Sequence, residues 1–310
     1  MSNPAPNAPE KLRVAVAICT KGRPAQLAET LQWLNRQTYT PCQVLVVATG
    51  SMDIPDNVEE RSSADLDIVF SPEGLTSQRN VALERLLKSC DVIFFMDDDY
   101  LAEKHAVQSI AKAFALHADV AGVTGQLLAD GIHTGGMSCT QAKRLITQFE
   151  KSAQKPATTI EDRRCNGLYG CNMAFRTSSI GTERFDEALP KYGWQEDVDF
   201  SNRVDGKIIR IGSLVGVHCG TPLGRERFGV ALGYSQIANP LYLMRKGTMR
   251  RNHAARLILR NFAANLVRLV WCERWVRRTG RITGNIWALW ELATGKIHPQ
   301  RIVANLEKNE

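Results

Sequence analysis

Several common sequence signatures are missing from this 310-residue chain. No two of its eight cysteines form a C-x-x-C pair, which argues against a disulfide framework or a zinc site and favours reduced thiols in the cytoplasm. The first residues, MSNPAPNAPE, contain no apolar stretch of signal-peptide length, so we expect residues 1–11 to form a disordered tail. No strand-like segment precedes G-x-G-x-x-G, and G-x-x-x-x-G-K-[ST] does not occur, which argues against a dinucleotide dehydrogenase and a P-loop NTPase.

Charge is unevenly distributed along the chain. Residues 1–220 contain 23 Lys and Arg against 27 Asp and Glu, a net charge of −4, whereas residues 221–310 contain 16 against 5, a net charge of +11. This split indicates an acidic catalytic or binding body followed by a basic segment that meets an anionic partner. No recognised nucleic-acid motif accompanies the basic segment, so no nucleic-acid partner is expected.

Short β-branched runs alternate with helical patterns in the first third of the chain. Strands are expected at residues 13–18, 43–48, 67–70 and 91–96, and helices at residues 24–37, 75–89 and 102–116. This alternation predicts an α/β fold with a mostly parallel sheet flanked by helices. Ligands of such sheets bind beyond the carboxyl ends of the strands, where an acidic triplet and the segment 20–23 are expected to lie.

The acidic triplet, Asp97, Asp98 and Asp99, directly follows an apolar run. Because side chains alternate along an extended strand, we expect Asp97 and Asp99 on one side and Asp98 on the other. A carboxylate pair at a strand end suits a hard divalent cation, Mg²⁺ or Mn²⁺, which completes its coordination with water and substrate phosphate. An acidic surface turn is the alternative interpretation.

Two further acids, Glu196 and Asp197, open a predicted helix shortly after Gly193 and Trp194. Acids in a first helical turn are ordinarily explained by the helix dipole. The apolar ring beside them and the acid pair elsewhere in the chain favour a general base instead. Arg79, early in the helix predicted from residue 75, is expected either to face a phosphate or to pair with an acid.

Six segments, taken in their order, resemble the family 2 glycosyltransferases with the GT-A fold. They are VAICTKGRP at 16–24, GLTSQRN at 74–80, FFMDDDYL at 94–101, GCNMAFR at 170–176, FDEALPKYGWQEDVDFSNRV at 185–204 and VHCG at 217–220. The resemblance implies an inverting, metal-assisted transfer of a sugar from a nucleotide-diphospho-sugar to a hydroxyl of a saccharide or lipid-linked acceptor, in surface polysaccharide or glycolipid synthesis. A catalytically silent sugar-nucleotide-binding or scaffold protein of the same fold, and a nucleotidyltransferase, are the alternatives.

The resemblance also implies roles for single residues. Nucleotide-sugar contacts are implied for five positions: Thr20, Arg23, Arg79, Asp97 and Asp98. Metal ligation is implied for Asp97 and Asp99, and Asp197 is implied as the catalytic base. Glu196 beside it shapes the acceptor site.

Two positions are less clearly assigned by the resemblance. His218 is either a further metal ligand or a structural histidine after a strand. Where the family usually has an Asp that meets the nucleobase or ribose, this sequence has Ala48, so the choice of nucleobase is not indicated.

The basic segment contains an amphipathic pattern at residues 251–278. On a helical wheel the apolar residues share one arc and the arginines lie on the opposite side. The apolar residues are Ile258, Leu259, Phe262, Leu266, Leu269, Val270 and Val276, and the arginines are Arg256, Arg260, Arg268, Arg274 and Arg278. With Trp271 and Trp275 at its flanks, this pattern predicts a helix that lies in an anionic membrane interface without spanning it. The alternative is a helix packed on the catalytic domain with an Arg-rich solvent face.

These expectations divide the chain into three parts. Residues 1–11 are a disordered tail, residues 12–222 a GT-A glycosyltransferase domain, and residues 223–310 a basic amphipathic helical extension. We expect the protein in the cytoplasm, peripheral on the inner face of the membrane.

Overall fold

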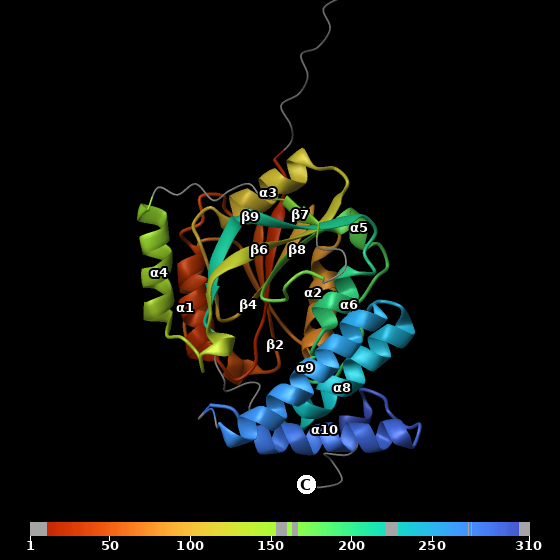
Figure 1. The fold of residues 1–310 in the computed structure, drawn as a ribbon. Helices are drawn as coiled ribbons and strands as arrows, with labels where there is room; N and C mark the ends of the chain where they lie inside the picture. Colours follow the sequence, from red (N-terminus) through yellow and green to blue (C-terminus); the bar gives the residue numbers. More distant parts are fainter. Residues whose placement is uncertain are drawn as a thin grey trace, which may run out of the picture.

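The computed structural model describes residues 11–152, 160–162, 167–220, 229–271, 273 and 275–303. Within these segments a central sheet carries helices on both faces, and a layer of long helices lies at one edge (Figure 1). The predicted tail lies, except for Lys11, outside the described residues. The boundary predicted between residues 222 and 223 also lies outside them, so the division into domains stays a prediction.

The first half of the sheet follows the predicted alternation. Its strands are β1 (Val14–Cys19), β2 (Gln43–Ala48), β3 (Leu66–Phe70) and β4 (Val92–Asp97), which pair in parallel in the order β3-β2-β1-β4. Helices α1 (Pro24–Leu34), α2 (Leu75–Leu86) and α3 (Ala106–Leu116) occur between or after them. Because side chains alternate along β1, its even-numbered residues pack with α1 in one core and Ala15 and Ala17 pack with α2 in the other.

The second half of the sheet mixes directions. The order continues from β4 through β8 (Asn172–Arg176), β6 (Val120–Asp130), β9 (Lys207–His218) and β5 (Tyr100–Ala102), while β7 (Ile160–Asp162) pairs with β9. Strand β8 is antiparallel to both neighbours, and β5 and β7 are antiparallel to β9, so the parallel arrangement is limited to the first four strands and the pair β6–β9. The helix predicted from residue 102 starts only at Ala106, because β5 occupies the residues before it.

Further helices connect these strands. They are α4 (Cys139–Lys151), α5 (Thr177–Ile180) and α6 (Glu196–Ser201), with 3₁₀ turns at Ser51–Asp53, Val58–Arg61 and Gly131–His133. The start of α6 at Glu196 confirms the helix predicted from the acidic pair. Gln195, the residue before α6, has a φ of 73°, so the chain turns sharply into this helix.

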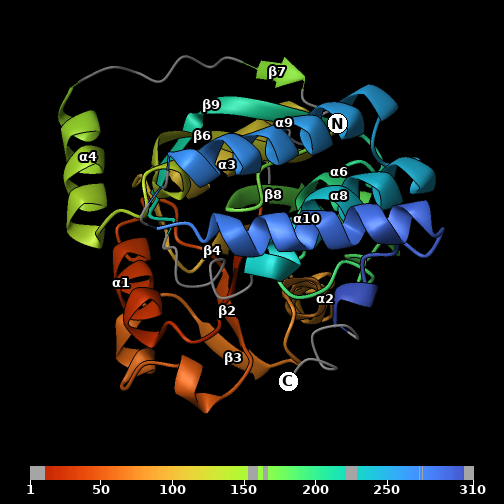
Figure 2. The ribbon, with the colours of Figure 1, turned by 60° about the horizontal axis from the view of Figure 1, so that its bottom comes forward.

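The helical extension consists of α8 (Gly229–Lys246), α9 (Arg251–Val270) and α10 (Arg278–Ala293), which pack on one another (Figure 2). Helices α8 and α10 approach very closely at glycines. A Cβ added to Gly233 would lie 2.1 Å from the carbonyl oxygen of Arg281, and one added to Gly284 would lie 2.0 Å from that of Val230. Only glycine permits backbones to approach to this distance.

The extension is attached to the catalytic body at α6. Asp199 of α6 is fully buried and accepts hydrogen bonds from Lys246 Nζ at 2.9 Å and Thr248 Oγ1 at 2.7 Å. Leu189 and Val198 pack there against apolar side chains of α8 and α9. The helix that carries the acidic pair therefore also forms the attachment point of the extension.

The helix predicted at residues 251–278 is wrong in its second part. Helix α9 ends at Val270 and α10 begins at Arg278, because the chain reverses between them. Arg278 is buried and binds Glu273 instead of facing solvent. The side chain of Arg274 lies outside the described residues.

The apolar stripe of α9 is partly exposed. Leu266 and Val270 have exposed fractions of 45% and 76%, whereas Ile258 packs against a buried cluster of α8 and α10. The residues that α9 buries most are Ala254, Leu257 and Asn265, none of which belongs to the stripe. No helix of the described segments has both the length and the hydropathy that crossing a bilayer requires.

Candidate active site

The acidic triplet contacts two groups of side chains, and Asp99 belongs to both of them. Asp98 is fully buried and accepts a hydrogen bond from Thr20 Oγ1 at 2.7 Å, and its carboxylate lies 2.6 Å from a guanidinium nitrogen of Arg23. Burial raises the pKa of Asp98, although the nearby Arg23 opposes this. Asp97 and Asp99 both lie beside His218, but Asp99 Oδ2 also lies 3.3 Å from Arg23 Nη1. Strand β4 ends at Asp97, and Asp98 and Asp99 form a turn, so the predicted alternation does not continue through the triplet. The alternative of an acidic surface turn is wrong in its exposure, because Asp98 and Asp99 are buried.

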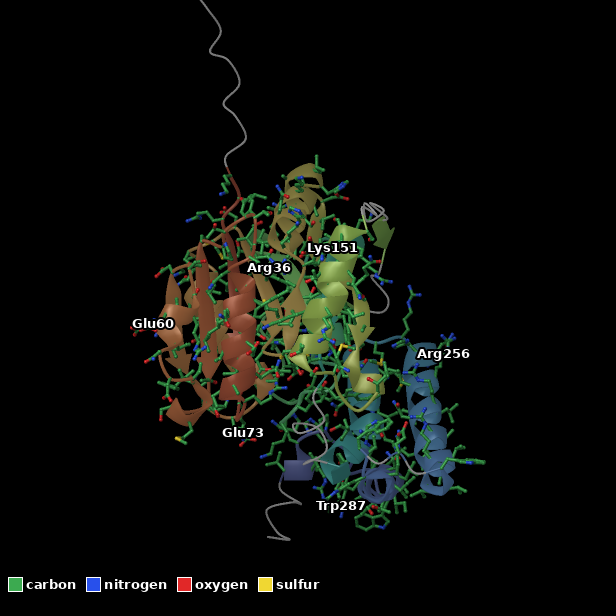
Figure 3. The ribbon with its side chains drawn as sticks, turned by 90° about the vertical axis from the view of Figure 1, so that its left-hand side faces the viewer. Arg36, Glu60, Glu73, Lys151, Arg256 and Trp287 are labelled. Atoms are coloured by element: carbon green, nitrogen blue, oxygen red, sulfur yellow. The ribbon has the colours of Figure 1, made fainter. Side chains whose placement is uncertain are left out.

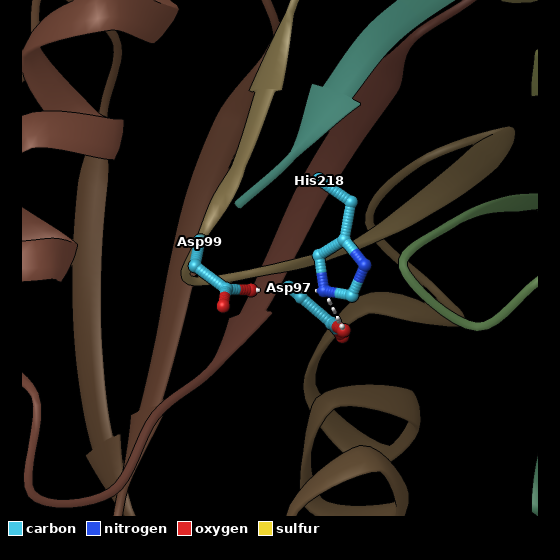
Figure 4. Close-up of side chains that lie close together, drawn as sticks. All are labelled: Asp97, Asp99 and His218. Atoms are coloured by element: carbon cyan, nitrogen blue, oxygen red, sulfur yellow. Dashed lines mark ion pairs between the residues drawn. The ribbon is translucent and has the colours of Figure 1, made fainter. Parts of the chain in front are cut away.

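Asp97, Asp99 and His218 form a cluster of possible metal ligands (Figure 4). His218 ends β9 and pairs with Tyr100 of β5, which places its ring next to Asp99. His218 Nε2 lies 3.2 Å from Asp99 Oδ1 and 3.6 Å from Asp97 Oδ2, and one ligand atom from each of the three residues lies within 4.8 Å of the others. Two carboxylates and one imidazole are a donor set that Mn²⁺ and related divalent ions accept.

Asp130, which the sequence prediction missed, orients the ring of His218. It ends β6 opposite His218, and its Oδ1 lies 3.0 Å from His218 Nδ1, while Tyr169 donates to its Oδ2 at 2.7 Å. A carboxylate on one ring nitrogen fixes the tautomer that leaves the other nitrogen to a metal. An acid at a strand end followed by Gly131 was the signal in the sequence.

The charge of His218 depends on these carboxylates. Burial lowers the pKa of His218, but hydrogen bonds with Asp130 and Asp99 outweigh burial and raise it to about 10. The imidazole is therefore protonated near neutral pH when only these acids surround it. A divalent cation would replace that proton as the positive charge at Nε2.

Arg79 lies at the centre of a second group of charges. The guanidinium is buried and binds Glu196, the carbonyl oxygen of Gly170 at 3.0 Å and Asp97 Oδ1 at 3.4 Å. Of the two predicted roles of Arg79, pairing with an acid is the one the structure contains. Burial raises the pKa of Glu196 to about 8, although Arg79 lowers it.

Asp197 is held by the backbone on both of its oxygens. Gly170 donates its N–H to Oδ2 at 2.9 Å, and Val198 donates its N–H to Oδ1 at 2.8 Å. Burial raises the pKa of Asp197, and Arg79 and these two hydrogen bonds oppose the increase. The carboxylate thus has a fixed orientation without a direct ion pair among the described residues.

A cavity of about 740 Å³ joins these groups. On the sheet side its lining includes the catalytic candidates Glu196 and Asp197, two of the three possible metal ligands, Asp97 and His218, and also Arg79 and Asp130. Its opposite wall comes from the helical extension. Thr20, Arg23, Asp98 and Asp99 are not among the described residues that line this cavity.

The loops after β1 and β2 are joined by one carboxylate. Asp53 accepts hydrogen bonds from the N–H groups of Gly22 at 2.6 Å, Thr49 at 2.8 Å and Gly50 at 3.1 Å. Asp53 lies five residues after Ala48, and Ala48 is the position where the family usually has an acid. Asp53 therefore binds backbone at the strand ends where the nucleotide contacts were predicted.

The fold is the GT-A fold of glycosyltransferases. A solved structure with this fold is the mannosyltransferase PcManGT from Pyrobaculum calidifontis in complex with GDP-Man and Mn²⁺, with a TM-score of 0.52 and 16% sequence identity over 93% of this chain and 90% of that one. Residues 15–181 match glycosyl transferase family 2. The chain belongs to this family of glycosyltransferases.

Two further similarities are more limited. A segment of 127 residues is 25% identical to a glucosyl-dolichyl phosphate glucuronosyltransferase of Haloferax volcanii, and it covers 39% of this chain and 40% of that protein. The structure of S. aureus TarS 1–349 has a TM-score of 0.49 and 16% identity over 74% of this chain and 66% of that one. The chain thus matches less than half the length of its Haloferax relative.

Proposed function

We propose that this protein is an inverting, metal-assisted glycosyltransferase in which Asp197 is the catalytic base. The observation that carries the proposal is that Asp197 lines the same cavity as Asp97 and His218, whose ligand atoms gather with that of Asp99 within 4.8 Å. A site for a diphosphate-binding cation and a positioned carboxylate are the two parts that the reaction requires.

Asp97, Asp99 and His218 would hold the cation. Their donor set fits Mn²⁺ or Mg²⁺, and Asp130 on the far side of the ring supports a neutral imidazole that presents Nε2. When bound, the cation stabilises the negative charge that develops on the leaving diphosphate. The complex of the Pyrobaculum mannosyltransferase with GDP-Man and Mn²⁺ is consistent with this assignment.

Asp197 would take the proton from the acceptor hydroxyl as that hydroxyl attacks the sugar. The two backbone hydrogen bonds fix its carboxylate, and its raised pKa makes it a stronger base than an exposed aspartate. A single displacement of this kind inverts the anomeric centre. Glu196 is bound to Arg79, but its Oε2 is buried and has no hydrogen-bond partner among the described residues, so it can accept from a second acceptor hydroxyl.

The helical extension supports a membrane location and a lipid-linked acceptor. Besides Leu266 and Val270, helix α9 exposes Trp271, and α10 exposes Ile286 and Trp290. Exposed apolar side chains on helices rich in arginine are typical of binding to an anionic membrane surface. The Haloferax relative is named for a glucosyl-dolichyl phosphate, which is a lipid-linked sugar. Its name supports a lipid-linked acceptor for this protein, at the cytoplasmic face of the membrane and in surface polysaccharide or glycolipid synthesis.

The test is Asp197→Asn in the full-length protein, with UDP-, GDP- and dTDP-sugars offered with and without Mn²⁺. We expect kcat to fall by a factor of about 10²–10⁴ while metal-dependent donor binding is kept. Wild-type kcat/KM should rise with pH through a pKa above the ordinary aspartate value, because only the deprotonated carboxylate accepts the proton. This acid limb should be absent in the variant.

Asp205→Asn is the matched control, because Asp205 follows α6 and is exposed. It should leave kcat and donor binding unchanged. Full activity of Asp197→Asn would refute the base, and donor binding that is indifferent to Mn²⁺ would refute the metal site.

A further inference from the structure

The wall that the helical extension gives to the cavity is strongly basic. It contains Arg260 and Arg268 of α9 and Arg278 and Arg281 of α10, and Glu273 is the single acid among its described residues. Four positive charges against one negative charge leave a formal charge of +3. We call these five residues the arginine wall, which faces the acidic sheet side of the same cavity.

A buried polar network positions this wall. Glu273 accepts from both Arg268 and Arg278, and Arg278 Nη1 donates to Asn265 Oδ1 at 2.8 Å. Asn265 is fully buried and donates to Gln236 and Asn285 at 2.8 Å each. Apolar side chains at the same helix interface would stabilise the fold as much as this polar network or more. The main contribution of the network is therefore that it holds the arginines in a fixed geometry.

Two donors of this region have no described acceptor. Arg260 forms no ion pair with any residue that the structure describes. The next residue, Asn261, also lines the cavity, and its Nδ2 is buried without a hydrogen-bond partner among the described residues. A buried amide donor beside guanidinium groups suits the oxygens of a phosphate.

We propose that the arginine wall binds a phosphate group of the acceptor. The proposal rests on the proposed function, in which the donor diphosphate lies at Asp97, Asp99 and His218 and leaves the opposite wall to the acceptor. The wall is continuous with Trp275, which lines the cavity, and lies near the exposed Trp271 at the end of α9. A phosphate carried by a lipid and one carried by a soluble sugar offer the same chemistry to the arginines.

The test measures ligand binding by intrinsic tryptophan fluorescence of the full-length protein. Mn²⁺ and whichever of UDP and GDP binds are present at saturation, so that the donor site is filled. The probes are farnesyl phosphate, farnesol, which lacks the phosphate, and glucose 1-phosphate, which lacks the lipid. Arg260→Gln and Arg268→Gln should each weaken farnesyl phosphate binding about tenfold and leave farnesol binding unchanged.

Arg256→Gln is the matched control, since Arg256 is exposed on α9 and does not line the cavity (Figure 3). It should bind farnesyl phosphate like the wild type. An equal loss in this control, or an equal loss of farnesol binding, would overturn the proposal. A loss of nucleotide affinity in Arg260→Gln or Arg268→Gln would also overturn it, because the arginines would then serve the donor.

The remaining comparison identifies the source of the phosphate. If glucose 1-phosphate binds with the same dependence on Arg260 and Arg268, the wall recognises a soluble phosphorylated acceptor. If only farnesyl phosphate does so, the acceptor is lipid-linked. Missing metal-dependent nucleotide binding would refute the proposed function, whereas intact nucleotide binding with no effect of the arginines would refute this inference alone.

Discussion

Asp199→Asn should loosen the helical extension from the catalytic body. The wild-type carboxylate is fully buried and accepts from Lys246, Thr248 and, at 3.1 and 3.0 Å, from two nitrogens of Arg203. The amide keeps the size of the side chain but removes its charge. Three elements therefore lose the charge that joins them, namely α6, the end of α8 and the turn that follows it.

The structure limits the size of the effect. Removal of one partner from a buried ion pair costs about 3–5 kcal/mol when the other charge is left unpaired. Here Lys246 keeps Asp186 at 2.5 Å and Arg203 keeps Glu183, so neither cation loses its last partner. We expect a loss of about 3 kcal/mol, which corresponds to two charge-assisted hydrogen bonds of about 1.5 kcal/mol each.

Thermal unfolding followed by circular dichroism measures this loss. At about 2 °C per kcal/mol for a chain of this size, Tm should fall by about 6 °C. The exposed Asp205→Asn should change stability by less than about 0.5 kcal/mol. If Asp199→Asn melted within about 1 °C of the wild type, the buried carboxylate would not hold the extension, and the reasoning would be refuted.

Two further predictions concern the metal and the membrane. Asp130→Asn should weaken Mn²⁺ binding, measured by isothermal titration calorimetry, about 10- to 100-fold, because His218 loses the group that orients its ring. Unchanged Mn²⁺ affinity would exclude His218 as an oriented ligand. The full-length protein should float with anionic liposomes at low salt and less so at high salt. Trp271→Ser should reduce the fraction of protein that floats. Flotation with neutral liposomes alone would contradict an electrostatic contribution to membrane binding.

Local patterns predicted the acidic side of the site well. Strand periodicity grouped Asp97 with Asp99 and apart from Asp98, and Asp97 and Asp99 do lie together beside His218, although β4 ends at Asp97 and the next two residues form a turn. The start of α6 at Glu196 likewise follows from a short stretch of sequence. In both cases the information lies within a few residues of the feature.

Long-range contacts explain what the sequence did not reveal. Asp130 and His218 are 88 residues apart, and only the register of β6 against β9 brings them together. The buried face of α9 was also not predictable from its apolar stripe. Contacts with α8, α10 and the body select Ala254, Leu257 and the polar Asn265 for burial, and a helical wheel contains none of these partners.

The close backbone contact of α8 and α10 at Gly233 and Gly284 fixes the distance between these two helices. Where backbones touch directly, no side chain is available to yield, so the two helices keep a constant separation. Arg278 and Arg281 stand on α10, so this contact fixes their position relative to α8. If the arginine wall binds the acceptor phosphate as proposed, Gly233 and Gly284 contribute to catalysis by holding that wall rigid, although neither of them lines the cavity.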